Sequence, residues 1–161
     1  MNHKSVPPGA LDGEMSALRE ALESRRLSLT PQRLEIAREA FTTHEHFTAE
    51  ELYDRVRKRD PRVGRMTVYR TLAVLVEAGL VEERAFSKER VHYEHVVGHP
   101  HHDHMVCVRC GRILEFSSPR IEKEQDRIAK ALGFRPLHHQ HTLFGMCRAC
   151  DKKQGPERKR T

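Results

Sequence analysis

The chain has 161 residues and a formal net charge of +6, with 29 Lys and Arg against 23 Asp and Glu. This length accommodates one ordinary domain or two small ones. No apolar run reaches the roughly 18 residues of a membrane span, and the N-terminal segment MNHKSVPPGA lacks the hydrophobic core of a signal peptide. We therefore expect a cytoplasmic protein that is not attached to a membrane and whose four cysteines are reduced.

The positive charge is unevenly distributed along the chain. Residues 1–100 carry 16 charges of each sign, so the surplus lies in residues 101–161. Within the first part, the run from Arg55 to Arg70 holds seven basic residues against Asp60 alone. Such a run is usually a solvated helix face, and by itself it gives limited support to nucleic-acid binding.

The N-terminal part begins with a lead-in over residues 1–13, rich in Pro and Gly, that we expect to be disordered. A first helix is predicted over residues 15–25. Thr30 and Pro31 then form an N-cap and a first helical residue, and this second helix runs to about Phe41. The inward-facing residues of the two helices are expected to be Leu18, Ala21, Leu22, Leu34, Ala37 and Phe41.

Two further helices and two strands follow. Residues 48–51 (TAEE) form a capping box that opens a third helix, which ends before Pro61. The fourth helix spans about 66–78, with Gly79 as its stop. Strands over 81–86 and 90–95 flank a turn at Ser87-Lys88-Glu89. The third helix is expected to bury Leu52 and Val56, and the fourth Val68, Leu72 and Leu75. Helices followed by a β-hairpin indicate a winged helix-turn-helix domain over residues 14–97.

The C-terminal part starts after a hinge predicted over residues 98–103, which contains the sequence GHP. Strands are expected at 104–108 and 112–116. A helix then opens at Ser118-Pro119 and ends at Gly133, and a last strand covers roughly 136–145. On the helix, Ile121, Ile128 and Leu132 share one face. The fold class is therefore α+β, with a small C-terminal α/β domain over residues 104–150 and a basic tail over 151–161.

Four cysteines form two CxxC pairs, Cys107 with Cys110 and Cys147 with Cys150. The two sulfurs of each pair can face one ion, and two pairs complete a closed tetrahedral shell of the kind that binds structural zinc. The alternative is a set of redox or unrelated thiols. Because neither pair lies in a βαβ context, the spacing favours a structural Zn²⁺ ion.

The sequence HHDH at residues 101–104 lies just ahead of the first cysteine pair. In an extended segment, alternate side chains point to opposite faces. His102 and His104 would share one face, and His101 and Asp103 the other, so one short run can serve two metal sites. Imidazole with carboxylate suits Fe, Mn, Zn or Ni and does not select one of them.

The fourth predicted helix directs Thr67, Tyr69 and Arg70 away from its apolar stripe. A polar N-terminal face with an apolar face toward the core is the layout of a DNA recognition helix. An ordinary amphipathic helix shows the same pattern, so the pattern alone leaves both interpretations open.

Several motifs together resemble the ferric uptake regulator family of metal-responsive transcriptional regulators. They are TPQR at residues 30–33, MTVYR at 66–70, YE at 93–94, HHDH followed by xxCxxC, and the downstream CxxC. The resemblance covers about residues 15–150. It implies a homodimer with an N-terminal DNA-binding domain and a C-terminal dimerisation domain. Metal at a regulatory site would then favour binding to a palindromic double-stranded operator, most simply as a repressor.

The resemblance also implies roles for individual residues. Tyr69 would contact bases and Arg70 a phosphate, with Thr67, Arg26 and Arg65 as further DNA contacts. Where the family often has a basic residue in the minor groove, this chain has Ser28, and Arg25 or Arg26 would replace it. The regulatory ligands would be His46, Glu94, His102, His104 and Glu115. The second-site ligands would be His101, Asp103, Glu122 and His139.

The sensed metal is expected to be iron(II). Zinc-sensing relatives tend to use a regulatory cysteine, and peroxide-sensing relatives tend to use aspartates where this chain has Glu94 and Glu115. Zinc, manganese or peroxide sensing within the family remain alternatives, because ligand type selects metals loosely. A metal-storage or buffer protein without DNA binding is a different class that the arginine-rich run disfavours. An enzyme is disfavoured because five ligands leave no open position on the ion.

Overall fold

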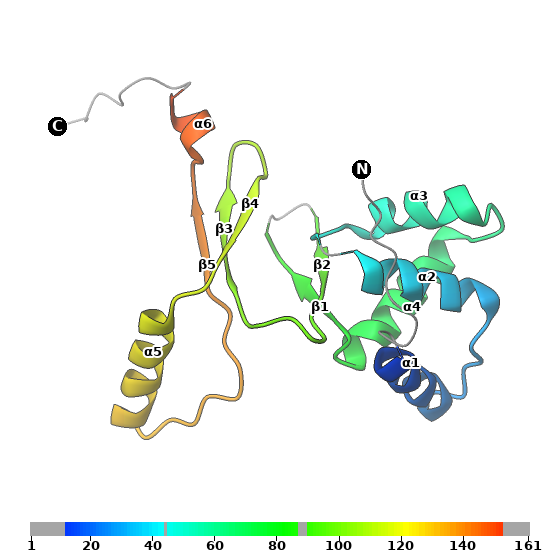
Figure 1. Cartoon of the computed structure of the whole chain (residues 1–161), viewed down its shortest axis with the longest axis horizontal. Coiled ribbons are helices and arrows are strands. Elements are labelled where there is room, and N and C mark those ends of the chain that lie inside the picture. Colours follow the sequence, from blue (N-terminus) through cyan, green and yellow to red (C-terminus); the bar gives the residue numbers. More distant parts are fainter. Residues whose placement is uncertain (1–11, 44, 87–89, 153–161) are drawn as a thin grey trace. The chain divides into compact units, whose positions relative to one another are not determined.

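The computed structural model describes residues 12–43, 45–86 and 90–152. The chain divides into two compact units, Met1–His99 and Pro100–Thr161, and the division falls inside the segment predicted as a hinge. Helices and strands occur in both units (Figure 1), which confirms the α+β class. No helix in the described ranges is both long and apolar enough to cross a bilayer.

The N-terminal unit contains four helices: α1 (Asp12–Ser24), α2 (Pro31–Thr42), α3 (Ala49–Arg59) and α4 (Arg65–Glu77). Two of their starts are fixed by side chains, as the sequence predicts. Thr30 Oγ1 accepts a hydrogen bond from the Arg33 amide at 3.3 Å. Thr48 and Glu51 form the reciprocal capping box, at 3.2 and 2.8 Å. The lead-in prediction is wrong at its end, since Asp12 and Gly13 belong to α1, and its residues 1–11 lie outside the described ranges.

A single apolar core holds these helices together. Leu18, Leu72 and Leu75 are fully inaccessible to solvent, and Phe41 is nearly so. Leu34, which was expected in the core, is only partly buried. The face of α2 that is turned inward carries Ile36, Ala37 and Ala40. The core also contains Leu22, Phe47, Leu52, Val56, Val63, Val68, Val74, Leu80 and Val81.

The two strands of the N-terminal unit form an antiparallel hairpin, β1 (Val81–Arg84) with β2 (His92–His95). Both are shorter than predicted, and the turn expected at 87–89 lies outside the described residues. A third segment joins the hairpin through a bridge between Phe47 and Tyr93, whose backbone amides and carbonyls exchange hydrogen bonds at 3.0 and 2.7 Å. This bridge places the neighbouring residues His46 and Glu94 side by side.

The C-terminal unit is a three-stranded sheet in the order β4-β3-β5 with two helices (Figure 1). β3 (Asp103–Cys107) pairs antiparallel with β4 (Ile113–Phe116) and parallel with β5 (Thr142–Gly145). The helices are α5 (Pro119–Ala131) and the short α6 (Arg148–Lys152), which the sequence analysis did not predict. The last strand was predicted too long, because β3 offers partners only from His104 onward and the ladder therefore begins at Thr142.

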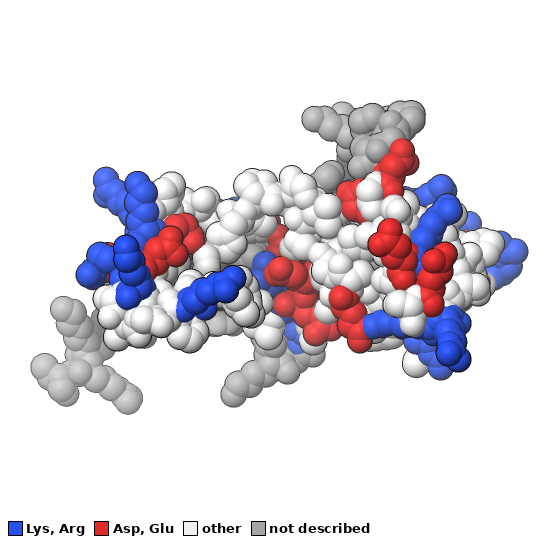
Figure 2. Space-filling model, turned by 90° about the horizontal axis from the view of Figure 1, so that it is seen from below, with Lys and Arg blue, Asp and Glu red and all other residues white. Residues whose placement is uncertain are grey.

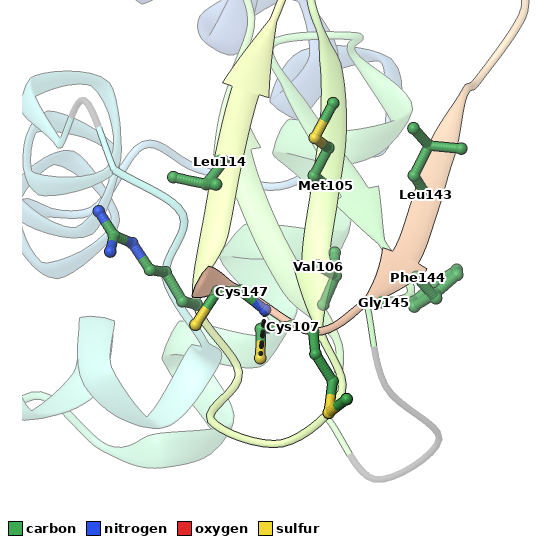
Figure 3. A pocket seen from close by; sticks show the side chains of 10 residues that line it. Met105, Val106, Cys107, Leu114, Leu143, Phe144, Gly145 and Cys147 are labelled. Atoms are coloured by element: carbon green, nitrogen blue, oxygen red, sulfur yellow. Dashed lines mark hydrogen bonds between the residues drawn. The ribbon is translucent and has the colours of Figure 1, made fainter. Parts of the chain in front are cut away.

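Little apolar surface is buried within this unit. Among its described residues, the buried hydrophobic side chains are Val106, Cys107 and Cys150, and α5 buries none. Figure 3 shows a hollow at the sheet that is lined mainly by apolar side chains of the three strands. The large apolar side chains that this unit leaves exposed on its strands are Met105, Leu114, Leu143 and Phe144. The predicted apolar residues of α5, Ile128 among them, are likewise not buried.

Candidate metal centres and nucleic-acid interface

The two cysteine pairs meet at one end of the sheet. Cys107 ends β3, and Cys110 follows in a turn completed by Gly111 with φ +71°. Cys147 immediately precedes α6, and Cys150 lies within it. The four sulfur atoms lie within 4.8 Å of one another, and Cys110 Sγ is 3.8 Å from Cys147 Sγ. Zn–S bonds of about 2.3 Å in a tetrahedron require S···S separations of roughly 3.8 Å. The donor set and its spacing therefore fit a structural zinc ion.

The backbone around the cysteines favours thiolates at two of the four positions. The amide of Cys147 donates to Cys107 Sγ at 3.3 Å (Figure 3), and this hydrogen bond contributes most to lowering the pKa of Cys107 to about 6. The Cys150 amide likewise lowers the pKa of Cys147. Hydrogen bonding with Cys110 raises the pKa of Cys150 to about 12, since that thiol retains its proton beside its thiolate neighbours. A divalent cation offsets this mutual repulsion.

A second cluster consists of His101, Asp103, Glu122 and His139, which offer ligand atoms within 4.8 Å of one another. Asp103 opens β3 and Glu122 lies in the first turn of α5. His101 Nε2 is 3.4 Å from Asp103 Oδ1, and His139 Nε2 is 3.2 Å from Glu122 Oε2. The structure brings together all four residues that the resemblance grouped as a second site.

Asp103 is the most informative member of this cluster. Its side chain is 1% exposed, and neither carboxylate oxygen has a hydrogen-bond partner within the described ranges. A buried carboxylate that is not hydrogen-bonded is costly, and the imidazoles around it are themselves metal ligands, so the site fits a bound cation. His141 lies 3.8 Å from Asp103 Oδ2 through Nδ1. The sequence analysis did not include His141, because it precedes β5 and no motif contains it.

The other predicted ligand group, the regulatory ligands, has three members in the C-terminal unit: His102, His104 and Glu115. The His102 and His104 rings lie 5.0 Å apart, so the predicted alternation of the HHDH run is observed. His104 pairs with Glu115 across β3 and β4. These three residues offer ligand atoms within 4.8 Å of one another.

The N-terminal members of that set, His46 and Glu94, belong to the other unit. His46 Nε2 lies 3.5 Å from Glu94 Oε2, and both side chains are less than 10% exposed. The His46 ring contacts Phe86 edge-on, with centroids 5.0 Å apart. Glu94 also accepts a hydrogen bond from Arg84 Nε at 3.2 Å. Sequence reasoning missed Arg84, although the strand register places it on the same hairpin as Glu94.

Helix α4 presents the residues predicted to read DNA. Tyr69 is 43% exposed and Arg70 is also exposed, whereas Thr67 is half-buried. Arg65, the first residue of α4, forms an ion pair with Glu50 of α3. The remaining candidate, Arg26, is exposed just after α1 with φ +56°.

Most of the basic run from Arg55 to Arg70 makes contacts within the protein. Arg59 forms ion pairs with Glu39 at 2.7 Å and Glu35 at 3.2 Å, and the Glu35 hydrogen bond is the main cause of its raised pKa. Arg62 pairs with Asp60. By contrast, Arg70 forms no ion pair with any described residue, which leaves its guanidinium available to a phosphate.

The comparisons with known proteins agree with this geometry. The model of the ferric uptake regulator family matches residues 24–144. The chain belongs to the ferric uptake regulator family. A ferric uptake regulation protein of Campylobacter jejuni is 37% identical over 142 residues, which are 87% of this chain and 90% of that protein. The family consists of metal-responsive transcriptional regulators, as the motifs predicted.

Two solved structures of the family are similar to this chain. The Helicobacter pylori ferric uptake regulator, described as having three functional metal binding sites, has a TM-score of 0.79 at 27% identity and covers 94% of this chain and 97% of its own. A zinc uptake regulator in complex with zinc and DNA has a TM-score of 0.56 at 26% identity and covers 91% of this chain and 99% of its own. Both likenesses extend over the two units.

Proposed function

We propose that this regulator binds a palindromic operator as a homodimer when a divalent metal, iron(II) first among them, occupies the regulatory ligands. The observation that carries the proposal is the difference in composition between the four-cysteine cluster and the groups of histidines and carboxylates. Cysteines alone suit a closed zinc site, whereas histidines with carboxylates suit an exchangeable ion. The three functional sites named for the Helicobacter pylori protein support this division.

The regulatory ion would take ligands from both units. His46 and Glu94 lie in the N-terminal unit, and His102, His104 and Glu115 lie in the C-terminal unit. In the proposed metal-free state, the carboxylates of Glu94 and Glu115 would repel each other if the two groups of ligands approached. When bound, the ion supplies the positive charge that offsets this repulsion and joins the two groups of ligands. A shift from 1:99 to 99:1 in favour of the DNA-binding state requires roughly 5.5 kcal/mol of preferential metal binding.

Dimerisation is proposed to use an apolar face of the C-terminal sheet. Met105, Leu114 and Leu143 are register partners on one face, and each exposes between 40 and 46% of its surface there. An apolar face of this kind is more typical of a protein–protein interface than of a monomer surface. A fixed dimer would hold two copies of α4 at the separation of successive major grooves.

On the operator, Tyr69 would contact base edges and Arg70 a phosphate. The complex of the zinc uptake regulator with DNA supports a DNA-binding role for this fold. Loss of one phosphate contact lowers the slope of log affinity against log salt by about 0.9. Arg70→Ala is expected to do so without changing which duplex is preferred, because phosphate contacts carry no sequence information.

The test uses the full-length protein with zinc retained at the cysteines. A duplex is first selected from a randomised pool by the metal-loaded protein, and its binding is then followed by fluorescence anisotropy at buffered free Fe²⁺, Mn²⁺ or Zn²⁺. His104→Ala is expected to lose metal-dependent binding while keeping its zinc and its dimer. The matched control is His138→Ala, which removes an exposed histidine outside the three clusters. Metal-dependent binding by His104→Ala at wild-type strength contradicts the proposal.

The same titration decides which metal is sensed. Iron(II) is expected to promote binding at the lowest free concentration relative to its cellular availability, because the regulatory ligands include no cysteine. A response to zinc alone would assign the chain to the zinc-sensing group. Binding that is independent of every metal tested would contradict metal regulation itself.

A further inference from the structure

One carboxylate contacts two of the residues proposed to read DNA. The Tyr69 hydroxyl donates a hydrogen bond to Glu50 Oε1 at 3.1 Å, and Arg65 forms an ion pair with the other oxygen, Oε2. Glu50 is the second residue of α3, whereas Tyr69 and Arg65 project from the first turns of α4. A single side chain on the neighbouring helix thus holds both groups on the recognition helix.

A second contact holds Arg65 in the same place. Its guanidinium carbon lies 4.6 Å from the centroid of the Tyr53 ring, a cation–π geometry. Arg65, Glu50 and Tyr69 are each between 43 and 57% exposed. DNA therefore has access to all three side chains, and Glu50 offsets part of the positive charge that Arg65 would offer to a phosphate.

The surface beside Tyr69 is acidic. A hollow of about 450 Å³ lies there, lined by Glu50, Glu51 and Asp54 together with one basic residue, Arg90. Figure 2 views the molecule from the side away from α3, and on that face Lys and Arg are interspersed with Asp and Glu. A carboxylate at this position repels a phosphate that approaches Tyr69 and Arg65.

We infer that Glu50 is a positioning residue that sets DNA specificity by orienting Tyr69 and by competing with phosphate for Arg65. The inference rests on the proposed function of α4 and adds a residue outside the proposed DNA contacts. On DNA of arbitrary sequence, the competition and the negative charge oppose binding. On the preferred duplex, the orientation of Tyr69 offsets the unfavourable effect of the Glu50 charge. A Tyr69 side chain that is already held in place loses less conformational entropy when it binds a base.

The inference predicts opposite effects on two probes. Glu50→Gln removes the charge, keeps the shape, and frees Arg65 to contact phosphate. An exposed ion pair contributes up to about fivefold in affinity, so affinity for a mixed-sequence 30-bp duplex should rise by roughly two- to fivefold. Its salt slope should steepen by up to about 0.9. Affinity for the wild-type-selected duplex should stay equal or fall, so the ratio of the two affinities drops by at least about threefold.

The matched control is Asp54→Asn, which removes the same charge from the same helix and the same hollow. Asp54 has no hydrogen bond or ion pair with a described residue of α4, so the inference expects its affinity ratio to stay near that of wild type. A second control combines Glu50→Gln with Tyr69→Phe. If Glu50 acts through the Tyr69 hydroxyl, its effect on the selected duplex disappears in the Tyr69→Phe background.

The experiment compares anisotropy titrations of metal-loaded wild type and variants on both duplexes at several salt concentrations. A drop in the affinity ratio for Glu50→Gln but not for Asp54→Asn supports the inference. Equal changes on the two duplexes, or equal effects of the two variants, overturn it. Failure of the wild-type protein to bind either duplex with metal would instead contradict the proposed function, so the two failures are distinguishable.

Discussion

The two units of this regulator are stabilised in different ways. The N-terminal unit buries a continuous apolar core in which many side chains, such as Leu18 and Leu72, are fully inaccessible. The described part of the C-terminal unit buries three hydrophobic side chains, two of which are cysteines. In their place it buries Asp103 and His104, at 1% and 2% exposure. The buried residues of the C-terminal unit thus include potential cation ligands, whereas the core of the N-terminal unit is built mainly from apolar side chains.

Under the proposed function, this difference assigns DNA binding to the N-terminal unit and the response to metal mainly to the C-terminal unit. A unit with its own apolar core keeps α4 in shape whether or not metal is bound. A unit with few apolar contacts depends on metal and on a partner subunit for its free energy of folding. In the proposed function, the closed cysteine site supplies that stability continuously, and the histidine and carboxylate ligands respond to a changing metal concentration.

The largest expected effect is the loss of the C-terminal fold when the cysteine site is broken. Cys107→Ser is expected to lose zinc and to unfold this unit, because structural zinc sites contribute about 10–16 kcal/mol of apparent binding free energy. Hydrogen exchange should show full exchange in β3 and β5 while α2 and α4 stay protected. The matched control is Val108→Ser, a 68% exposed neighbour that should keep both zinc and fold. If β3 and β5 stayed protected in zinc-free Cys107→Ser, the C-terminal unit would not depend on zinc for its fold.

A smaller effect is expected from the apolar core. Leu72→Ala should lower the free energy of unfolding of the N-terminal unit by about 2–5 kcal/mol, because its side chain is fully buried. Zinc content should remain at the wild-type value. The control is Leu137→Ala, which changes the same side chain at 85% exposure and should alter stability by less than about 0.5 kcal/mol. Zinc loss in Leu72→Ala would show that the two units do not fold independently.

The sequence predicted best where one local rule decides the outcome. The capping box at Thr48, the Pro31 start of α2 and the Gly79 stop of α4 follow from short-range chemistry, and all three are observed. The alternation of the HHDH run is equally local. The two CxxC pairs were predicted to share one ion on spacing alone, and the structure brings their four sulfurs together.

Other features depend on packing that no motif encodes. The length of β5 is set by the few residues that β3 offers as partners. Glu50 meets Tyr69, and His141 meets Asp103, only because separate elements fold against each other. The residue assignments of the regulatory set came from the family resemblance, since spacing relates neither His46 nor Glu115 to the HHDH run.

The smallest expected effect concerns the start of α3, the helix that carries Glu50. Thr48→Ala removes the side-chain oxygen that accepts from the Glu51 amide at 3.2 Å, so an amide at the helix N-terminus loses its partner. The free energy of unfolding of the N-terminal unit should fall by about 1 kcal/mol, measured by urea denaturation. Thr48→Ser keeps the hydroxyl and should retain most of that stability. Equal losses in the two variants would assign the effect to the Thr48 methyl group, and the capping hydroxyl would then contribute no stability to this unit.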